Sequence, residues 1–170
     1  KVYDIPIFYF PKFFQPDPTV KRQSGLLAPF FTNSTSLGTG FAQPYYWAIN
    51  KNKDLTFTPK IYTGENILLL NEYRQAFKDG FLILDTSYTK GYKDTSATKT
   101  GGSRNHIFAN FDLNLVENES YQSDLSIKVQ RTSNDTYFKK HNINTALVNA
   151  ENTTLKNEIK YSFAKDDMYL

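Results

Sequence analysis

The sequence predicts an all-β fold, an up-and-down antiparallel meander. Several segments alternate apolar and polar residues with a period of two, which places apolar side chains on one face of a strand and polar ones on the other. Clusters of turn-forming residues separate these segments. No segment has the i, i+3, i+4 spacing of an amphipathic helix, so we expect minimal helix content.

The alternation is clearest in residues 107–115, where the apolar residues occupy the odd positions. Similar alternation recurs in residues 54–61, 124–130 and 156–163. Because strand side chains alternate between faces, each of these strands should have one apolar and one polar face. On the apolar face we expect Leu113, Leu115, Leu125, Ile127 and Val129, and on the polar face Asn114, Ser126 and Lys128.

Short turns alternate along the chain with longer connections such as residues 91–103, which are rich in Thr, Ser, Lys and Gly. This asymmetry is typical of a membrane β-barrel with tight turns at one end and longer loops at the other. Strands of about 9–11 residues cross a bilayer when tilted. By period-two counting, the chain contains roughly eight or nine strands of such a barrel.

The first 23 residues differ from the rest. Four prolines, at positions 6, 11, 16 and 18, break this stretch into short extended pieces, of which only residues 5–9 make a good strand. We therefore predict two parts, residues 1–23 and residues 24–170, and expect the first to leave the main meander at an angle.

The composition favours a barrel and excludes some classes of functional site and partner. Aromatic residues make up 16% of the chain, with 14 Phe and 12 Tyr, and the mean hydropathy is −0.54; outer-membrane barrels need aromatics at both bilayer interfaces. The absence of cysteine excludes disulfides and thiolate sites from these residues. A net charge of +3 is too small to imply nucleic acid as a partner. No signal peptide opens the chain, so we expect an internal fragment.

Nothing in the sequence indicates an enzyme, a metal site or a cofactor. The two histidines, His106 and His141, have no cluster of other ligands around them, so surface positions are expected for both. Ser24 has no nucleophile elbow around it. The carboxylates are scattered singly and are expected on the polar face of the sheet: Asp54, Glu72, Asp85, Asp112 and Asp124.

A family resemblance adds a specific expectation. The segments that carry it are residues 5–11, 21–29, 44–49, 54–59 and 71–74, and beyond Tyr88 residues 133–138, around a Tyr-Phe pair. In this order they resemble the LptD family, the lipopolysaccharide-assembly proteins of the Gram-negative outer membrane. The resemblance implies that residues 1–23 are the end of a periplasmic β-jelly roll with its linker. Residues 24–170 would then be the first strands of a large transmembrane β-barrel.

The resemblance also implies a function and partners. The whole protein would insert lipopolysaccharide into the outer leaflet of the outer membrane through a laterally opening barrel, with its N-terminal residues in the periplasm. The implied partners are lipopolysaccharide, outer-membrane lipid, an LptE-like plug lipoprotein and an LptA-like periplasmic bridge protein. The bridge protein would bind a part of the jelly roll that these residues do not contain.

Two prolines are the candidate functional site. Pro29 and Pro44 each remove one donor from a region that otherwise reads as strand, and on physical grounds they mark an edge strand, a bulge or a gate. In the LptD family, prolines in the two leading strands weaken the seam that opens laterally. The resemblance therefore implies that Pro29 and Pro44 form the lateral gate.

Two further groups have open interpretations. Lys21 and Arg22 are either solvated linker charges or contacts for lipid A phosphates and headgroups, since both side chains pair well with phosphate. Tyr45, Tyr46 and Trp47 fit an interfacial aromatic belt, with a core aromatic cluster as the alternative.

Two other classes of protein compete with the LptD interpretation. The first is a soluble or surface-exposed β-sandwich that binds a ligand, and the second is a diffusion porin. A sandwich would pack its apolar faces against each other and stay monodisperse without detergent, whereas a barrel would turn its apolar face to lipid.

Overall fold

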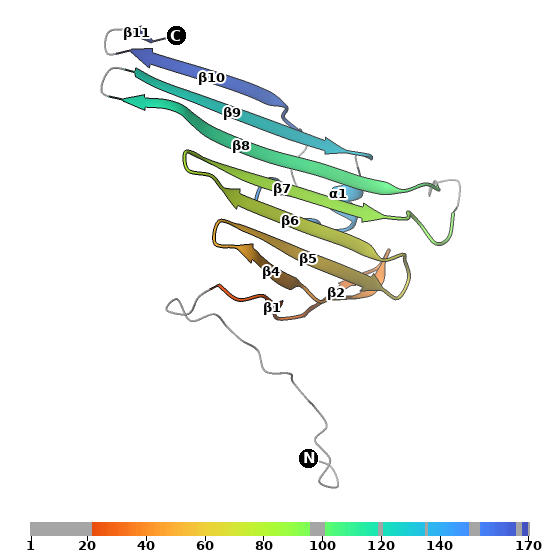
Figure 1. Ribbon diagram of the computed structural model, residues 1–170. Coiled ribbons are helices and arrows are strands. Elements are labelled where there is room, and N and C mark those ends of the chain that lie inside the picture. The colour runs from red at the N-terminus through yellow and green to blue at the C-terminus, as the bar shows by residue number, and fades with distance from the viewer. Residues whose placement is uncertain are drawn as a thin grey trace.

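The computed structural model describes residues 22–95, 101–118, 121–134, 136–149, 154–165 and 168–169. These form one curved antiparallel sheet of eleven strands, most of them neighbours in chain order (Figure 1). The strands are β1 (Gly25–Leu26), β2 (Phe30–Ser34), β3 (Gly38–Ala42), β4 (Tyr45–Asn50), β5 (Lys53–Tyr62), β6 (Leu68–Ala76), β7 (Gly80–Thr89), β8 (Arg104–Asn118), β9 (Tyr121–Thr132), β10 (Glu158–Lys165) and β11 (Met168–Tyr169). A four-residue helix, α1 (Tyr137–Lys140), lies between β9 and β10.

The predicted all-β antiparallel meander is confirmed. The sheet order is β1-β4-β5-β6-β7-β8-β9-β10-β11, and β2 and β3 form a hairpin that joins through β3 to β5. The prediction that residues 1–23 form a separate part falls outside the described residues except for Arg22 and Gln23.

The strand register confirms the predicted faces. Leu113 lies opposite Leu125, and Asp112 lies opposite Ser126, in the β8–β9 pair. Directly opposite residues of an antiparallel pair project from the same face. Ile127, Val129 and Lys128 follow the same alternation, opposite Phe111, Ala109 and Asn110. Leu115 lies at a register shift between residues 114 and 116, which marks a β-bulge.

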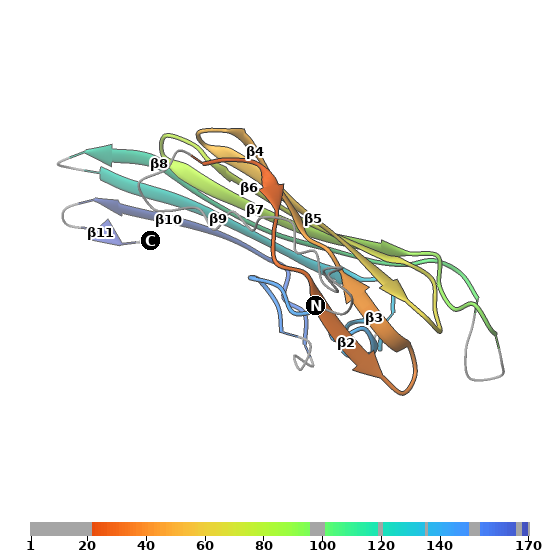
Figure 2. The same cartoon turned by 90° about the horizontal axis from the view of Figure 1, so that it is seen from below.

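The two faces of the sheet differ in what covers them. One face, here called the inner face, is covered by the segment of residues 136–149, which lies beneath the sheet in Figure 2. The other, the outer face, leaves its apolar side chains exposed. These side chains include Phe31, Phe41, Trp47, Ile61, Tyr88, Ile107, Val129, Ile159 and Tyr161. A sandwich would have buried this face, whereas a barrel presents it to lipid.

The two ends of the sheet differ in the length of their connections. At one end, here called the short-turn end, residues 51–52 join β4 to β5 and residues 77–79 join β6 to β7. At the other end the connections are residues 63–67, 90–103 and 133–157. The predicted alternation of short turns and longer connections is therefore present in the structure. Among the described helices, none has the length and apolar character to span a membrane.

Candidate functional site

Both candidate gate prolines lie at interruptions of a strand. Pro29 separates β1 from β2, and Pro44 separates β3 from β4. Strand β5 therefore has two partners along one edge, β4 beside its first half and β3 beside its second. Figure 2 shows β2 and β3 bending out of the sheet toward its inner side.

At Pro44 the strand keeps its register across the interruption. Tyr45 pairs with Phe57 and Ala42 pairs with Lys60, so the residues between them oppose each other one to one. The N–H of Leu27 donates to the carbonyl of Pro44 over 2.9 Å. In such a pair the return bond would come from the N–H that proline lacks. The side-chain amide of Gln43 supplies it instead, with its Nε2 donating to the carbonyl of Leu27 over 2.8 Å.

At Pro29 the stretch that contains β1 and β2, here called the first strand, has one residue more than the β3–β4 stretch that pairs with it. Between the pairs Leu26–Tyr45 and Phe30–Ala42, three residues of the first strand (27–29) oppose two of the second (43–44). This is the count of a β-bulge. The side chains of the first strand change their odd-even phase there, so that odd positions face inward in β1 and even positions face inward in β2.

Pro29 lies in the first strand, the outermost one described, next to the free edge of the sheet. In β3, Thr39 and Gln43 bond to the β5 side, through Thr63 and Pro59. The alternating residue Ala42 therefore turns its backbone groups toward its partner in β2, Phe30. Alternation counted back from Phe30 would turn position 29 the opposite way, so we expect its missing donor at the edge that no described strand covers.

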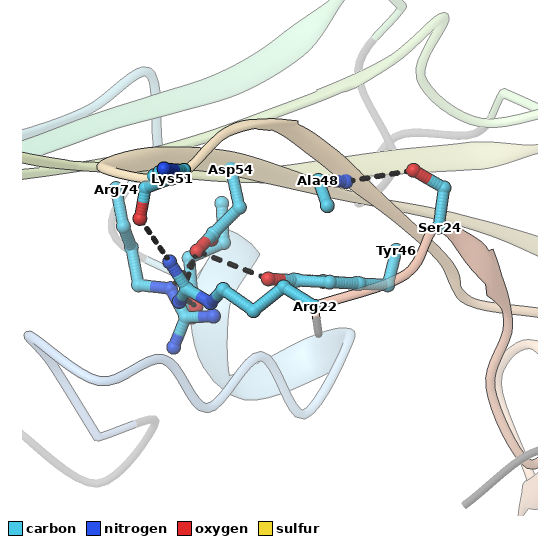
Figure 3. Close-up of polar contacts among 8 residues, drawn as sticks. Arg22, Ser24, Tyr46, Ala48, Lys51, Asp54 and Arg74 are labelled. Carbon is cyan, nitrogen blue, oxygen red and sulfur yellow. Dashed lines mark hydrogen bonds and ion pairs between the residues drawn. The ribbon is translucent and has the colours of Figure 1, made fainter. Parts of the chain in front are cut away.

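Beside the short-turn end, a buried carboxylate joins the first described residues to the sheet (Figure 3). Asp54 is 1% exposed. Its Oδ2 accepts from Nη2 of Arg22 over 2.7 Å, and its Oδ1 accepts from Nε of Arg74 over 2.8 Å. The hydroxyl of Tyr46 donates to Oδ2 over 3.3 Å. Charge-assisted bonds of this kind are the strong class of protein hydrogen bond.

Two more bonds fix the same stretch of chain. Nη1 of Arg22 donates to the carbonyl of Lys51 over 3.3 Å, and the N–H of Ala48 donates to the hydroxyl of Ser24 over 2.9 Å. Residues 22–24 are thereby held along β4 and the β4–β5 turn, as Figure 3 shows.

The structure places the other candidate residues as follows. Lys21 lies outside the described residues. Tyr45 and Trp47 are 40% and 50% exposed on the outer face, whereas Tyr46 turns to the inner face and Asp54. The three aromatic residues therefore do not share a face, and the aromatic belt and the phosphate contact of Arg22 stay predictions.

The segment of residues 136–149 packs on the inner face through an apolar core. The sheet and the β2–β3 turn contribute Leu37, Tyr62, Leu68 and Phe108, and the segment contributes Tyr137, Phe138, Ile143 and Val148. The β2–β3 hairpin bends toward this core because Leu37 at its turn is buried there. The hydroxyl of Tyr137 shares a 2.7 Å hydrogen bond with Ser87, which also bonds Nδ1 of His106. Burial raises the pKa of Tyr137 to about 12.

The expected surface positions of the two histidines are wrong. His106 is 2% exposed and His141 is 7% exposed. The ring of His106 stacks on Phe108, with centroids 4.7 Å apart, and meets the edge of Phe138 at 4.8 Å. The signal in the sequence was the set of apolar residues in an otherwise polar loop, Tyr137, Phe138, Ile143 and Val148.

Comparison with known proteins decides the family. The chain matches the LptD protein family over residues 1–168. The chain belongs to the LptD family. It is 33% identical over 134 residues to the LPS-assembly protein LptD of Haemophilus ducreyi, which covers 78% of this chain and 16% of that protein. It is 42% identical over 74 residues to LptD of Shewanella oneidensis, which covers 44% of this chain and 10% of that protein.

A further relative extends the match along the chain. LptD of Pseudoalteromonas atlantica is 29% identical over 147 residues, or 81% of this chain and 19% of that protein. The chain thus spans at most about a fifth of the length of these LptD relatives. The exposed apolar side chains of the outer face are consistent with an LptD barrel wall.

In this LptD-family chain, docking of residues 136–149 should weaken in acid. Burial, and after it Lys140 and Lys60, lower the pKa of His141 to about 4. An undocked histidine titrates near 6.5, so the undocked segment takes up a proton that the docked segment excludes. Docking is therefore complete above about pH 6.5 and weakens as the pH falls toward 4, by at most about 3 kcal/mol. Hydrogen exchange at the amide of Ile143 measures this, after correction for the intrinsic pH dependence.

The variant His141→Gln serves as the control, because glutamine has no proton to gain in this range. It should remove most of the pH slope of exchange between pH 6.5 and 4. An equal slope in both proteins would show that another group governs docking in acid.

Proposed function

We propose that this chain forms the leading edge of an outer-membrane β-barrel that inserts lipopolysaccharide into the outer leaflet by opening laterally between its first and last strands. The family assignment supports lipopolysaccharide as the substrate, since the matched relatives are named LPS-assembly proteins. The exposed apolar outer face supports a position in lipid. No bond is made or broken in this function.

The observation that carries the proposal is the weak free edge formed by β1 and β2. This edge consists of a two-residue strand and a five-residue strand, separated by Leu27, Ala28 and Pro29. The missing donor of Pro29 would face the position where a closing strand pairs. Each absent hydrogen bond removes about 0.5–1.5 kcal/mol from such a seam. A short, interrupted edge of this kind is suited to reversible opening.

The proposed partners follow from the same arrangement. The short-turn end, where Arg22 joins the sheet, would face the periplasm, and residues 1–23 would connect to the jelly roll and its LptA-like bridge protein. An LptE-like lipoprotein would occupy the barrel interior, beside the polar inner face. Arg22 is 51% exposed at its side chain, which leaves it room to contact a lipid A phosphate while paired with Asp54.

Replacing both Pro29 and Pro44 with alanine in the full-length protein should slow lipopolysaccharide export. Alanine at 29 would add a donor to the free edge, and alanine at 44 would replace the side-chain bond from Gln43 with a backbone bond between β4 and β1, so that the seam gains a bond and its support becomes a regular ladder. We expect less lipopolysaccharide at the cell surface and greater sensitivity to large hydrophobic antibiotics, measured at equal protein abundance.

The matched control is Pro59→Ala, which also replaces a proline within the sheet but in β5, away from the free edge. It should leave export unchanged. If the double variant exports as well as the wild type at equal abundance, Pro29 and Pro44 are ordinary edge residues and the gate lies elsewhere.

A further inference from the structure

A cavity of about 140 Å³ lies between the inner face of β5–β7 and the covering segment at residues 143–145. Its walls combine carboxylates, hydroxyls and apolar side chains. They include Thr56, Thr58, Leu70, Glu72, Asp85 and Ile143. Thr56 opposes Glu72 and Thr58 opposes Leu70 in the β5–β6 pair, so these four side chains share the inner face.

Two carboxylates stand opposite each other in this cavity. Glu72 pairs directly with Asp85 across β6 and β7, an arrangement that is destabilising when both are charged and nothing lies between them. Glu72 has one cationic neighbour, Nε of Arg74 at 3.5 Å, but that atom already donates to Asp54 over 2.8 Å.

Asp85 is the less satisfied of the two. It is 4% exposed and lines the cavity. Its ion-pair partner is Nε2 of His106 at 3.6 Å, which is beyond hydrogen-bonding distance. That nitrogen is itself buried with no hydrogen-bond partner among the described groups. A nearly buried carboxylate whose ion-pair partner lies beyond hydrogen-bonding distance is costly unless water or a ligand in the cavity completes it.

The charged groups around the cavity are one positive charge short of neutrality. Three carboxylates (Asp54, Glu72 and Asp85) face two guanidiniums (Arg22 and Arg74) across the linked contacts, which leaves a net charge of −1 when His106 is neutral. A metal ion is a poor fit, because the described residues contain no group of three or more His, Asp or Glu side chains that could hold one. A single ammonium group matches both the charge and the oxygen acceptors.

We propose that this cavity receives the side chain of a lysine from a protein that occupies the barrel interior. The ammonium lies between Glu72 and Asp85, with the threonine hydroxyls as further acceptors, and the methylene stem lies against Leu70 and Ile143. The proposal rests on the proposed function, because it needs an interior protein. Beyond that function, it specifies how the inner face binds the interior protein, through an ion pair between two carboxylates and a lysine.

Carbodiimide coupling in cells that express the full-length protein tests this contact. The reagent joins a carboxylate to an amine in direct contact, forming an amide while the carbodiimide takes up the water and becomes a urea. Peptide mapping should find Asp85 or Glu72 joined to a lysine of another protein chain. An excess of butylammonium, which mimics the lysine side chain, should reduce the yield at least tenfold.

The combined variant Asp85→Asn and Glu72→Gln keeps the size of both side chains and should abolish the cross-link. The control Asp124→Asn, which changes a carboxylate of β9 away from the cavity, should retain it. Folding of each variant is checked on a gel, where a folded barrel migrates differently before and after heating.

Three results would overturn the inference: no amide at either carboxylate, an amide to a lysine of the same chain, or an amide to an amine of a lipid. None of these bears on lateral release, which the proline variants test separately. Conversely, unchanged export in the proline variants would refute the gate and leave a mapped lysine contact standing.

Discussion

Replacing Phe138 with alanine should release the segment of residues 136–149 from the inner face while the sheet persists. The Phe138 ring is 7% exposed and lies 4.9 Å from the Phe108 ring and 4.8 Å from the His106 ring, centroid to centroid. Removing a buried phenylalanine from a packed core costs about 3–5 kcal/mol. Docking should therefore weaken by about two orders of magnitude or more.

Trypsin provides the measurement, because Lys139 and Lys140 follow Phe138 directly and are held in the docked helix. Cleavage at these lysines in the folded full-length protein should accelerate by a factor close to the loss of docking. The matched control is Phe31→Ala, an aromatic that is 74% exposed on the outer face. Equal cleavage rates in the two variants would mean that the buried core does not hold the segment.

Replacing Asp54 with asparagine should detach Arg22 from the sheet. Asparagine has the shape of aspartate but not its charge, so it loses two charge-assisted bonds, each worth about 1.5–3 kcal/mol when well shielded. The arginine side chains are 51% and 37% exposed, and water can solvate them once they are released. We therefore expect a net loss of roughly 1–3 kcal/mol, with faster hydrogen exchange at Ala48, whose amide is bonded to Ser24.

The control for this variant is Asp112→Asn. Asp112 also accepts hydrogen bonds on the inner face, from Ser126 over 2.6 Å and Asn110 over 3.0 Å, but has no link to residues 22–24. A double-mutant cycle with Arg22→Gln isolates the ion pair, and the two substitutions should be clearly non-additive. Additive effects, or exchange at Ala48 equal to that of the Asp112 variant, would show that Asp54 does not hold residues 22–24 on the sheet.

The faces of the sheet could be predicted because alternation is a local property. Leu125, Ile127 and Val129 are separated by single polar residues, and any antiparallel pairing in register must place them together. The interruptions at Pro29 and Pro44 were likewise visible, since a missing N–H is a property of one residue. A bulge was one interpretation of these prolines, but the extra residue at 27–29 could not be counted in advance, because it depends on how many residues the partner strand supplies.

The contacts of the charged residues could not be predicted in the same way. Asp54 was expected on a solvated face, yet it is buried because Arg22 and Arg74, 32 and 20 residues away in the sequence, converge on it. The strand register decides which charged side chains meet, and that register cannot be predicted from the single charged residues of a polar strand. The burial of His106 had the same cause, since it requires Phe138, from a distant loop, to fold back onto β8.

The extra residue at positions 27–29 prevents β1 and β2 from merging into one continuous strand. For β1 and β2 to merge into one uninterrupted ladder, one of them would have to slip by a residue along its partner. Such a slip turns every side chain of the slipped part over. If β2 slipped, Phe31 would leave its 5.3 Å contact with Phe41 on the outer face and turn toward the inner face. If this edge opens as proposed, it can therefore re-form only in its interrupted state.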